Sequence, residues 1–584
     1  MNAANLLVLA MTVATPTPAA GTCQVTKIVE FPVTMSGRRP IVAAQFGTKE
    51  ARFIIDSGAF YSTISKASAA EFGLKVMPAP PYFRLKGIGG DASAGVALAA
   101  DFSLAGVKVR SADFIVGGSD TGMAGLIGQN ILGLQDVEYD LPHGIVRLMK
   151  TSGCARVGLA YWAGEKPFTS IPLEGPTGRW FKPHTIGAIV LNGVKMRAAF
   201  DTGAESSLVS LAAAKRAGVT PESPGVTRAG ISSGLGSHRV PTWLAVFDKI
   251  EIGGEAIKHP KIRIGQVDLN DVDMLIGADF FLTHRIFVSN TNRVMYFTYE
   301  GGPVFGPSAR GAFTADGKAL DLTDKTVGPT TAEEFSRRGA VLESNHRFDE
   351  ALADFDKATQ LAPSEGRYFY QRATLRLARG QREAGLADLD RTLSLSPTNV
   401  DARLTRAGIR LRGDNKAAAS EDIKVADAAL APTSEKRLTL AALYDRADMP
   451  QAALANYDLW LKSHPEDSSR SYAFNGRCWA RAQLNSDLDK ALRDCDNAIK
   501  AQPKNAAFLD SRALVRLRRG ELPQALADYD AAIQLAPKNA WSLYMRNIVE
   551  AKMGKSDQAK ADRQAAFDID PKIANRTKRL GLEN

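Results

Sequence analysis

The chain has few of the residues that bind metal ions, and it has few long apolar segments. It contains seven histidines and four cysteines in 584 residues. The histidines are scattered without the spacing of a metal site, and no HExxH sequence occurs, so zinc chemistry is not expected. After residue 22 no apolar run is long enough to span a bilayer. We therefore expect no metal, no cofactor and no integral membrane segment in the mature chain.

Charge of one sign is not concentrated anywhere in the sequence. The formal net charge of +10 is modest for this length, and there is no long block of lysine and arginine. Aromatic and basic residues do not alternate as they do in nucleic-acid-binding segments, so nucleic acid is not an expected partner. A hydrophobic content of 45% and a charged content of 23% are ordinary for globular protein. The length allows several domains, each with its own core.

The first 22 residues have the pattern of an export signal. Leu6–Met11 form a short apolar core, and small residues follow it. The core is too short to anchor the chain in a membrane, although no Lys or Arg precedes it as in most signal peptides. We predict cleavage and export to a bacterial periplasm or to the medium. A lipid anchor at Cys23 is less favoured, because Thr22 precedes it in place of Gly, Ala or Ser.

Residues 26–300 have a strand-like pattern that repeats once. Short runs of Val, Ile, Phe and Thr alternate with glycine turns. The two halves can be aligned, so that segment 102–106 corresponds to 250–254, and each half closes with a pair of strands. A duplication of this length predicts two all-β lobes, at residues 26–150 and 166–300.

Each predicted lobe carries one copy of an Asp-Ser/Thr-Gly-Ala motif, at residues 56–59 and 201–204. Each motif is followed further along the chain by two apolar residues and a glycine, at 126–128 and 275–277. The separations between the motif Asp and this glycine are 72 and 76 residues. A single Asp before Gly is common in turns. Two copies with matched partners instead predict one carboxylate from each lobe, and paired carboxylates suit acid–base hydrolysis of a peptide bond.

The C-terminal part changes from strand-like to helical patterning. Residues 301–329 are rich in Gly, Pro, Ser, Thr and Asp and are predicted to be a linker. From residue 330 the apolar period is 3.6, and a proline recurs every 33 to 38 residues after an amphipathic helix. This pattern resembles the tetratricopeptide repeat, in about seven copies over residues 330–584. The resemblance implies stacked helix pairs whose concave face binds protein partners.

The four cysteines fall into two pairs. Cys23 and Cys154 flank the first lobe, and Cys478 and Cys495 fall on the two predicted helices of one repeat. If the protein is exported, both pairs can form disulfides. Buried free thiols are the alternative for each pair, and the sequence favours neither.

The β region resembles the retropepsin-like aspartic proteases in its paired motifs, its apolar-apolar-Gly runs and its glycine-rich segments. The resemblance implies that Asp56 and Asp201 meet at the lobe interface and share one proton. One carboxylate would then act as the base on water while the other polarises the scissile carbonyl. Retropepsins pair two single-lobe chains, whereas the two lobes are fused here.

The same resemblance implies supporting roles for neighbouring residues. Ser57 and Thr202 would hydrogen-bond across the interface, while Gly58 and Gly203 would let backbone N–H groups approach the carboxylates. Glycine-rich segments would form flaps that close over an extended peptide and exclude water. The glycines concerned are Gly87, Gly89, Gly90, Gly230 and Gly234.

Two functions are compatible with these patterns. The first is an exported aspartic endopeptidase whose repeats recruit polypeptide substrates or partner proteins. The second is a non-catalytic, peptide-binding pseudoprotease that acts as an interaction scaffold. A third arrangement pairs the lobes between two chains. In every case the expected fold is multidomain, with a two-lobed all-β domain followed by an all-α solenoid.

Overall fold

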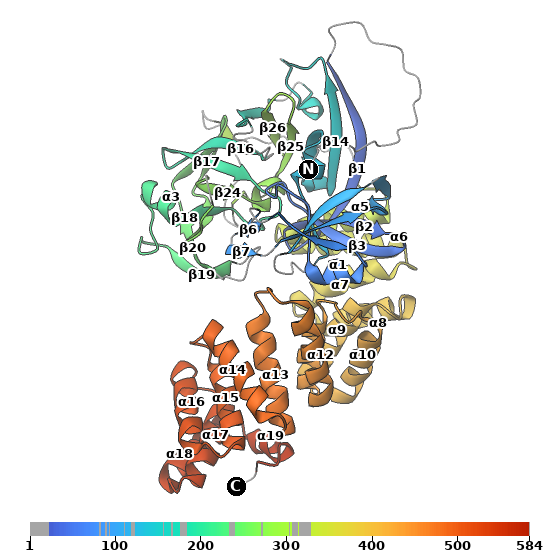
Figure 1. Ribbon diagram of the computed structural model, residues 1–584. Coiled ribbons are helices and arrows are strands. Elements are labelled where there is room, and N and C mark those ends of the chain that lie inside the picture. Colours follow the sequence, from blue (N-terminus) through green and yellow to red (C-terminus); the bar gives the residue numbers. More distant parts are fainter. Residues whose placement is uncertain are drawn as a thin grey trace. The chain divides into compact units, whose positions relative to one another are not determined.

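The computed structural model in Figure 1 describes residues 23–582, apart from 81–82, 84, 88–89, 93, 110, 118–122, 156, 165–166, 176–183, 233–239, 270–271, 303, 306–312 and 315–328. The predicted export segment, and much of the predicted linker, therefore lie outside the described residues. The chain divides into two compact units, Met1–Ser396 and Pro397–Asn584. No helix among the described residues is long and apolar enough to cross a membrane.

The first unit contains two β lobes built on the same plan. Lobe 1 comprises β2 (Arg39–Phe46), β3 (Lys49–Ile55), β4 (Thr63–Ile64), α1 (Lys66–Glu71), β5 (Val76–Pro78), β6 (Leu85–Gly87), β7 (Gly90–Ala92), β8 (Gly95–Ala99), β9 (Phe102–Leu104), β10 (Val107–Val109), β11 (Ala112–Val116), β12 (Gly125–Ile127) and α2 (Gln129–Leu132). Lobe 2 comprises β16 (Ile186–Leu191), β17 (Val194–Phe200), β18 (Leu208–Ser210), α3 (Leu211–Arg216), β19 (Thr227–Ser232), β20 (Val240–Val246), β21 (Lys249–Ile252), β22 (Glu255–Lys258), β23 (Lys261–Gly265), β24 (Met274–Ile276), α4 (Ala278–Phe281) and β27 (Phe313–Thr314).

The strand order confirms the predicted duplication. Lobe 1 runs β2-β3-β12-β4-β11-β8-β5, and lobe 2 runs β16-β17-β24-β18-β23-β20-β19. In each lobe the strand before the Asp motif pairs in parallel with the strand of the apolar-apolar-Gly run, β3 with β12 and β17 with β24. The repeated sequence therefore folds twice into one topology, as two copies of one strand pattern should.

A sheet of six strands, which continues through the pairing of β1 with β2 into lobe 1, joins the lobes within one chain. It consists of β1 (Gln24–Ser36), β13 (Asp136–Asp140), β14 (Ile145–Ser152), β15 (Thr169–Pro172), β25 (His284–Ser289) and β26 (Val294–Tyr299), in the order β15-β26-β25-β13-β14-β1. At its centre β13 pairs antiparallel with β25, and Tyr139 lies opposite Ile286. Short 3-10 turns, η1 (Leu141–His143) and η2 (Tyr161–Ala163), flank this interlobe sheet. The arrangement that pairs lobes between two chains is therefore not the one observed.

Alternating apolar residues fill the core of each lobe. In lobe 1 the rings of Phe46, Phe53, Phe102 and Phe114 contact one another, with centroids 5.1–6.1 Å apart. Each ring is buried, and full burial of a phenylalanine contributes about 1.5–3 kcal/mol. This aromatic cluster fixes β2, β3 and β11, and thus the strand from which the first Asp motif emerges.

Two helix pairs also belong to the first unit. They are α5 (Ala332–Ser344), α6 (Phe348–Leu361), α7 (Gly366–Ala378) and α8 (Arg382–Leu395). Helix α5 begins with a capping box between Thr331 and Glu334. It lies beside β1 (Figure 1), and its Val341 is buried in the same core as the β lobes. Ser344 Oγ donates a hydrogen bond of 2.5 Å to the Gly37 carbonyl.

The second unit consists of helices that continue the same repeat. They are α9 (Val400–Arg412), α10 (Lys416–Ala429), α11 (Arg437–Arg446), α12 (Pro450–Ser463), α13 (Arg470–Leu484), α14 (Leu488–Ala501), α15 (Ala506–Arg518), α16 (Leu522–Leu535), α17 (Ala540–Lys552), α18 (Ser556–Ile569) and α19 (Ile573–Arg579). Helices α5 to α18 form consecutive pairs, and the second helix of each pair ends two or three residues before the recurring proline. The predicted tetratricopeptide-like fold is confirmed.

An arginine–aspartate ion pair recurs within the helix pairs. The arginine lies on the first helix, and the buried aspartate lies on the second. The pairs are Arg338–Asp354, Arg372–Asp388, Arg406–Asp422, Arg477–Asp494, Arg512–Asp528 and Arg546–Asp562. The pair α11–α12 has Leu440 and Asn456 at these positions, so both partners are replaced together. There Arg437 bonds to Asn456 instead, at 2.6 Å.

Candidate active site

Parallel strand pairing brings each Asp motif to the interface between the lobes. Asp56 directly follows β3, and its backbone N–H donates to the Ile127 carbonyl at 3.0 Å. Asp201 directly follows β17, and its N–H donates to the Ile276 carbonyl at 2.8 Å. The apolar-apolar-Gly runs thus hold the backbone from which the two carboxyl groups project.

The two carboxyl groups meet at this interface, each directly beside the glycine of the opposite motif. Each also accepts backbone N–H groups from its own loop. Asp56 Oδ1 accepts from Gly58 at 2.9 Å and from Ala59 at 2.8 Å. Asp201 Oδ1 accepts from Gly203 at 2.8 Å and from Ala204 at 3.2 Å. The backbone therefore orients both carboxyl groups through equivalent contacts in the two lobes.

The glycines of the motifs make this close approach feasible. A Cβ placed on Gly58 would lie 2.4 Å from Asp201 Cγ, and one on Gly203 would lie 2.4 Å from Asp56 Cγ. Both distances are well below a van der Waals contact. Each glycine therefore leaves the space that the other lobe's carboxyl group occupies.

Ser57 and Thr202 link the two loops by four buried hydrogen bonds. Ser57 Oγ donates to the Phe200 carbonyl at 2.8 Å, and Thr202 Oγ1 donates to the Ile55 carbonyl at 2.7 Å. In return each hydroxyl accepts the backbone N–H of the other residue, at 2.9 and 3.0 Å. The hydroxyl of each lobe thus holds the backbone of the other.

Burial raises the pKa of both aspartates. For Asp56 desolvation is the largest cause, the negative charge of Asp201 raises the pKa further, and it lies well above its usual range. For Asp201 desolvation again dominates, while hydrogen bonds from Asp56 and from backbone N–H groups oppose it. Two adjacent carboxylates cannot readily both ionise, so the pair holds one proton and titrates as a unit.

Comparisons with known proteins agree with this geometry. Residues 42–131 and 187–280 each match the family described as aspartyl protease. The two lobes belong to the aspartyl protease family. A search of curated proteins gave no match for the chain.

Solved structures resemble the chain at low identity. A tetratricopeptide repeat protein from Parabacteroides merdae is 16% identical, with 43% of this chain and 98% of that chain covered and a TM-score of 0.34. YrrB, described as a tetratricopeptide protein with an unusual peptide-binding site, is 17% identical, with 38% and 97% covered and a TM-score of 0.21. The Cut9–Hcn1 hetero-tetramer is 14% identical, with a TM-score of 0.30; the match covers 38% of this chain and only 43% of that one.

A second pair of polar contacts supports the protease loops from behind, and the sequence alone did not reveal it. In lobe 1 the Ser62 hydroxyl donates to Asn130 Oδ1 at 2.8 Å and accepts the Gly128 N–H at 3.0 Å. In lobe 2 the Ser207 hydroxyl donates to Asp279 Oδ1 at 2.7 Å. Each serine lies six residues after the motif aspartate of its lobe, Asp56 or Asp201, and that equal spacing was the signal available in the sequence.

The glycines predicted to form flaps are only partly described. Gly87 and Gly90 pair with each other across the β6–β7 hairpin of the first protease lobe. Gly230 lies in β19 with a φ of +83°, where the β19–β20 register shifts. That conformation favours glycine. Gly89 and Gly234 lie outside the described residues.

Both cysteine pairs are joined. Cys23 bonds to Cys154, which ties the start of β1 to the residues after β14. Cys478 and Cys495 link α13 to α14. Among the described residues, no group of three or more His, Cys, Asp or Glu side chains could hold a metal ion.

Proposed function

We propose that the protein is an aspartic endopeptidase that uses Asp56 and Asp201 to activate water. The observation that carries the proposal is the meeting of two carboxyl groups, one from each lobe, held by equivalent backbone contacts in two segments that match the aspartyl protease family. A dyad with one shared proton offers a base and an acid at one place. An inactive scaffold would have no need of both acids or of the glycines that make room for them.

The proposed reaction requires no group beyond the dyad and water. The ionised carboxylate takes a proton from water as its oxygen bonds to the peptide carbonyl carbon, and the protonated carboxyl donates to the carbonyl oxygen. The tetrahedral intermediate then collapses, its C–N bond breaks, and a proton passes to the leaving amine. Because the two acids titrate together, neither is assigned one role alone.

The first test replaces each acid by its isosteric amide. Asp56→Asn or Asp201→Asn should reduce cleavage of a quenched fluorescent peptide library at least about 1,000-fold, because neither half is complete alone. The fold should persist, since each amide keeps an oxygen that can accept the loop N–H groups. Circular dichroism and the melting temperature check that point.

Two results would contradict the endopeptidase proposal. One is an absence of cleavage by the unmutated protein between acidic and neutral pH, with peptides still bound; this would favour the pseudoprotease scaffold. The other is cleavage at the original rate by both amide variants.

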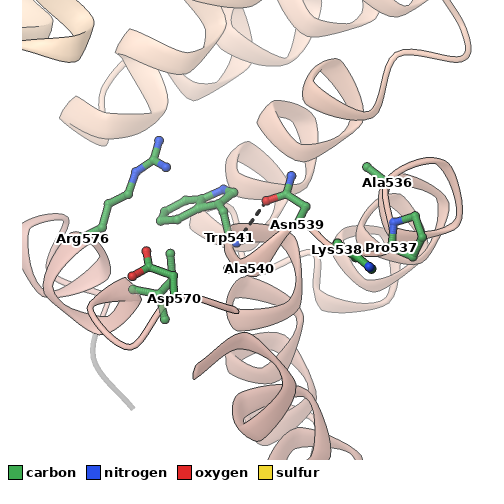
Figure 2. Close-up of a pocket in the computed structure, with 9 residues that line it drawn as sticks. Ala536, Pro537, Lys538, Asn539, Ala540, Trp541, Asp570 and Arg576 are labelled. Carbon is green, nitrogen blue, oxygen red and sulfur yellow. Dashed lines mark hydrogen bonds between the residues drawn. The ribbon is translucent and has the colours of Figure 1, made fainter. Parts of the chain in front are cut away.

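The helical repeats are proposed to recruit polypeptide partners. A pocket of about 690 Å³ opens at the start of α17, between the α16–α17 loop and α19 (Figure 2). Trp541 forms an apolar wall, with the Arg576 guanidinium 4.4 Å from its ring centroid, and Lys538 and Asp570 also line the pocket. Such a mixed apolar and charged surface suits a peptide. Lys538→Gln should weaken partner binding and leave cleavage of short peptides unchanged.

Export is proposed for the same chain. Two disulfides are expected in an oxidising compartment and are rare in the cytosol. Expression in a bacterial host, followed by fractionation and N-terminal sequencing, tests the proposal. Recovery from the cytosol with residues 1–22 attached and four reduced thiols would contradict it.

A further inference from the structure

The last helix of the chain contacts the first helices of three preceding repeats. Helix α19 packs on α17, where the Arg576 guanidinium lies over the ring of Trp541 (Figure 2). The same guanidinium lies 5.5 Å from the ring centroid of Trp479, which belongs to α13. On α15, Arg518 Nη2 donates a hydrogen bond to the carbonyl of Leu580, the residue after α19. Helix α19 therefore reaches back to α13 and does not merely cover the last helix pair.

Two aliphatic side chains anchor the C-terminal segment on these helices. Ile573, the first residue of α19, is 4% exposed, and Leu582, just beyond the helix, is 8% exposed. Both belong to the apolar core that also contains Leu514 of α15 and Trp541 of α17. Ile573 and Arg576 are three residues apart and therefore share one side of the helix. The segment thus presents an arginine with aliphatic residues before and after it.

The charges of the segment and of the helices beneath it are complementary. Residues 572–582 contain four lysines and arginines and no aspartate or glutamate. Beneath them Asp510, on α15, is 5% exposed and accepts a hydrogen bond of 2.8 Å from Ser542. Burial raises the pKa of Asp510 to about 6, against the Ser542 hydrogen bond and the positive charge of Arg576. A basic segment therefore suits the surface formed by Trp479, Asp510 and Trp541, here called the first-helix face.

Helix α19 satisfies this face incompletely. Trp541 Nε1 is a buried donor and Asp510 Oδ1 is a buried acceptor, and neither has a hydrogen-bond partner among the described residues. A buried polar atom without a partner costs free energy, and most such atoms in proteins are paired. A segment that keeps the arginine and the aliphatic anchors, and also pairs with these two atoms, would bind the face more tightly than α19 does.

We propose that the first-helix face is a docking site for a basic polypeptide segment with an arginine between aliphatic residues, and that α19 is its built-in competitor. The partner segment displaces α19 and places its arginine over the two tryptophan rings. The inference rests on the recruiting role proposed for the repeats and names the class of partner. Because displacement sacrifices the contacts of α19, only segments that interact more favourably with the face are recruited.

The test measures binding of a fluorescent synthetic peptide, with the sequence of residues 571–582, to the full chain by fluorescence anisotropy. In the unmutated protein α19 competes at a high effective concentration, so binding should be weak. Ile573→Ser removes one anchor of α19 and should raise the affinity about 10-fold. Arg576→Ala disturbs the fold less and should raise it about 3-fold. The matched control is Lys572→Ala, whose exposed side chain precedes α19, and it should change nothing.

A substitution on α13 locates the bound peptide. Trp479→Ala, added to Ile573→Ser, should reverse the gain in affinity, because Trp479 lies two helix pairs before α17 and contacts only the arginine end of the segment. Circular dichroism checks that each variant is folded. Equal affinity in the unmutated protein, Ile573→Ser and Arg576→Ala would overturn the proposal, as would a gain that Trp479→Ala leaves intact.

Two further outcomes separate this inference from the recruiting role itself. If light scattering shows that Ile573→Ser dimerises, the face binds α19 of a second copy, and the partner site is overturned. If a partner protein binds through Lys538 and the α19 variants do not alter its affinity, the docking proposal fails while the recruiting proposal stands. Absence of peptide and partner binding in every variant would overturn both.

Discussion

At Gly58 and Gly203 the absence of a side chain is a requirement of the dyad, because the carboxyl group of the other lobe fills the space. Gly58→Ala would place a methyl group 2.4 Å from Asp201 Cγ, and the backbone there has no freedom to retreat without breaking the Ser57 bonds. We expect cleavage to fall at least about 100-fold, since the carboxyl pair separates. Peptide cleavage by purified protein measures this.

The matched control for that substitution is Gly254→Ala, whose added Cβ meets open space. It should keep full activity. Retained activity in Gly58→Ala would mean that the two carboxyl groups do not need their close approach.

The buried acid behind the second loop makes stability depend on pH. Desolvation is the main cause that raises the pKa of Asp279, against opposing hydrogen bonds from Ser207 and the charge of Arg38. A raised folded-state pKa favours the folded state below the unfolded pKa, and this advantage is lost as pH rises through the folded pKa. Asp279→Asn should therefore gain stability relative to the unmutated protein at neutral pH and lose that gain near pH 3.

Lobe 1 supplies the reciprocal variant, because it already has Asn130 at this position. Asn130→Asp should lower stability at neutral pH and have a smaller effect in acid. Thermal melts of both variants from pH 3 to pH 8 provide the measurement. A pH-independent difference for either variant would contradict the argument.

The pair of aspartates could be predicted at the scale of residues, whereas the contacts that support it could not. Asp56 and Asp201 stand in short motifs whose repetition is visible in the sequence. Gln129, whose Nε2 donates to the Ser57 carbonyl, lies 72 residues further along the chain. Nothing in its local sequence marks this contact, because the side chain reaches Ser57 only when β12 pairs with β3.

At the scale of elements, the helix pairs depend on a buried ion pair that one repeat has replaced. In the last pair Asp562 is held by both Nε and Nη2 of Arg546. Arg546→Leu leaves a largely buried carboxylate without this partner and should lower the free energy of unfolding by about 3 kcal/mol. Adding Asp562→Asn, which copies Leu440 and Asn456 of the fourth repeat, should restore at least half of that loss.

A solvent-exposed arginine–aspartate pair provides the control. Arg379 and Asp349 contact each other, but the Asp349 side chain is 88% exposed. Arg379→Leu should leave the melting temperature nearly unchanged, since exposed pairs contribute little. Urea unfolding measures the loss of stability in both variants. If Arg546→Leu and Arg379→Leu lower the free energy of unfolding equally, burial does not determine how much these ion pairs contribute.

The helices themselves were predictable because proline and apolar period are local signals. The ion pairs were not, although each aspartate lies 16 or 17 residues after its arginine. That spacing crosses a turn between two helices, so the contact is visible only when the helices pack. Likewise β1 and β15 lie almost entirely in the region predicted to be strand-like. The pairing of β1 with both β14 and β2, and the place of β15 at one edge of the sheet, come from tertiary structure.

At the scale of the whole molecule, the compact unit that contains the dyad extends through Ser396. Its core includes Val341 and Leu342 of α5 and Phe355 of α6. A chain that ends at residue 396 should remain folded and cleave peptides. A chain that ends at residue 329 should lose several kcal/mol of stability, at about 1.5–3 kcal/mol for each large side chain no longer buried. Melting curves and solubility measurements on the two fragments test both expectations.

The converse result is equally informative. If the fragment of residues 1–329 melts at the same temperature as the fragment of residues 1–396, the contact between α5 and β1 does not contribute to stability. The sequence predicted a linker before residue 330 and could not indicate this contact, because the apolar face of α5 looks like that of any other repeat helix.

The packing of α5 into the β lobes also sets an order of events during biosynthesis. The strands around Asp56 and Asp201 are all made before the ribosome reaches Thr331. Their core is incomplete until α5 and α6 have emerged, because side chains of both helices belong to it. Domains generally form as units while the chain is synthesised or translocated. We therefore expect nascent chains to be unable to cleave their neighbours, because the β lobes complete their core only after the first helix pair has been synthesised.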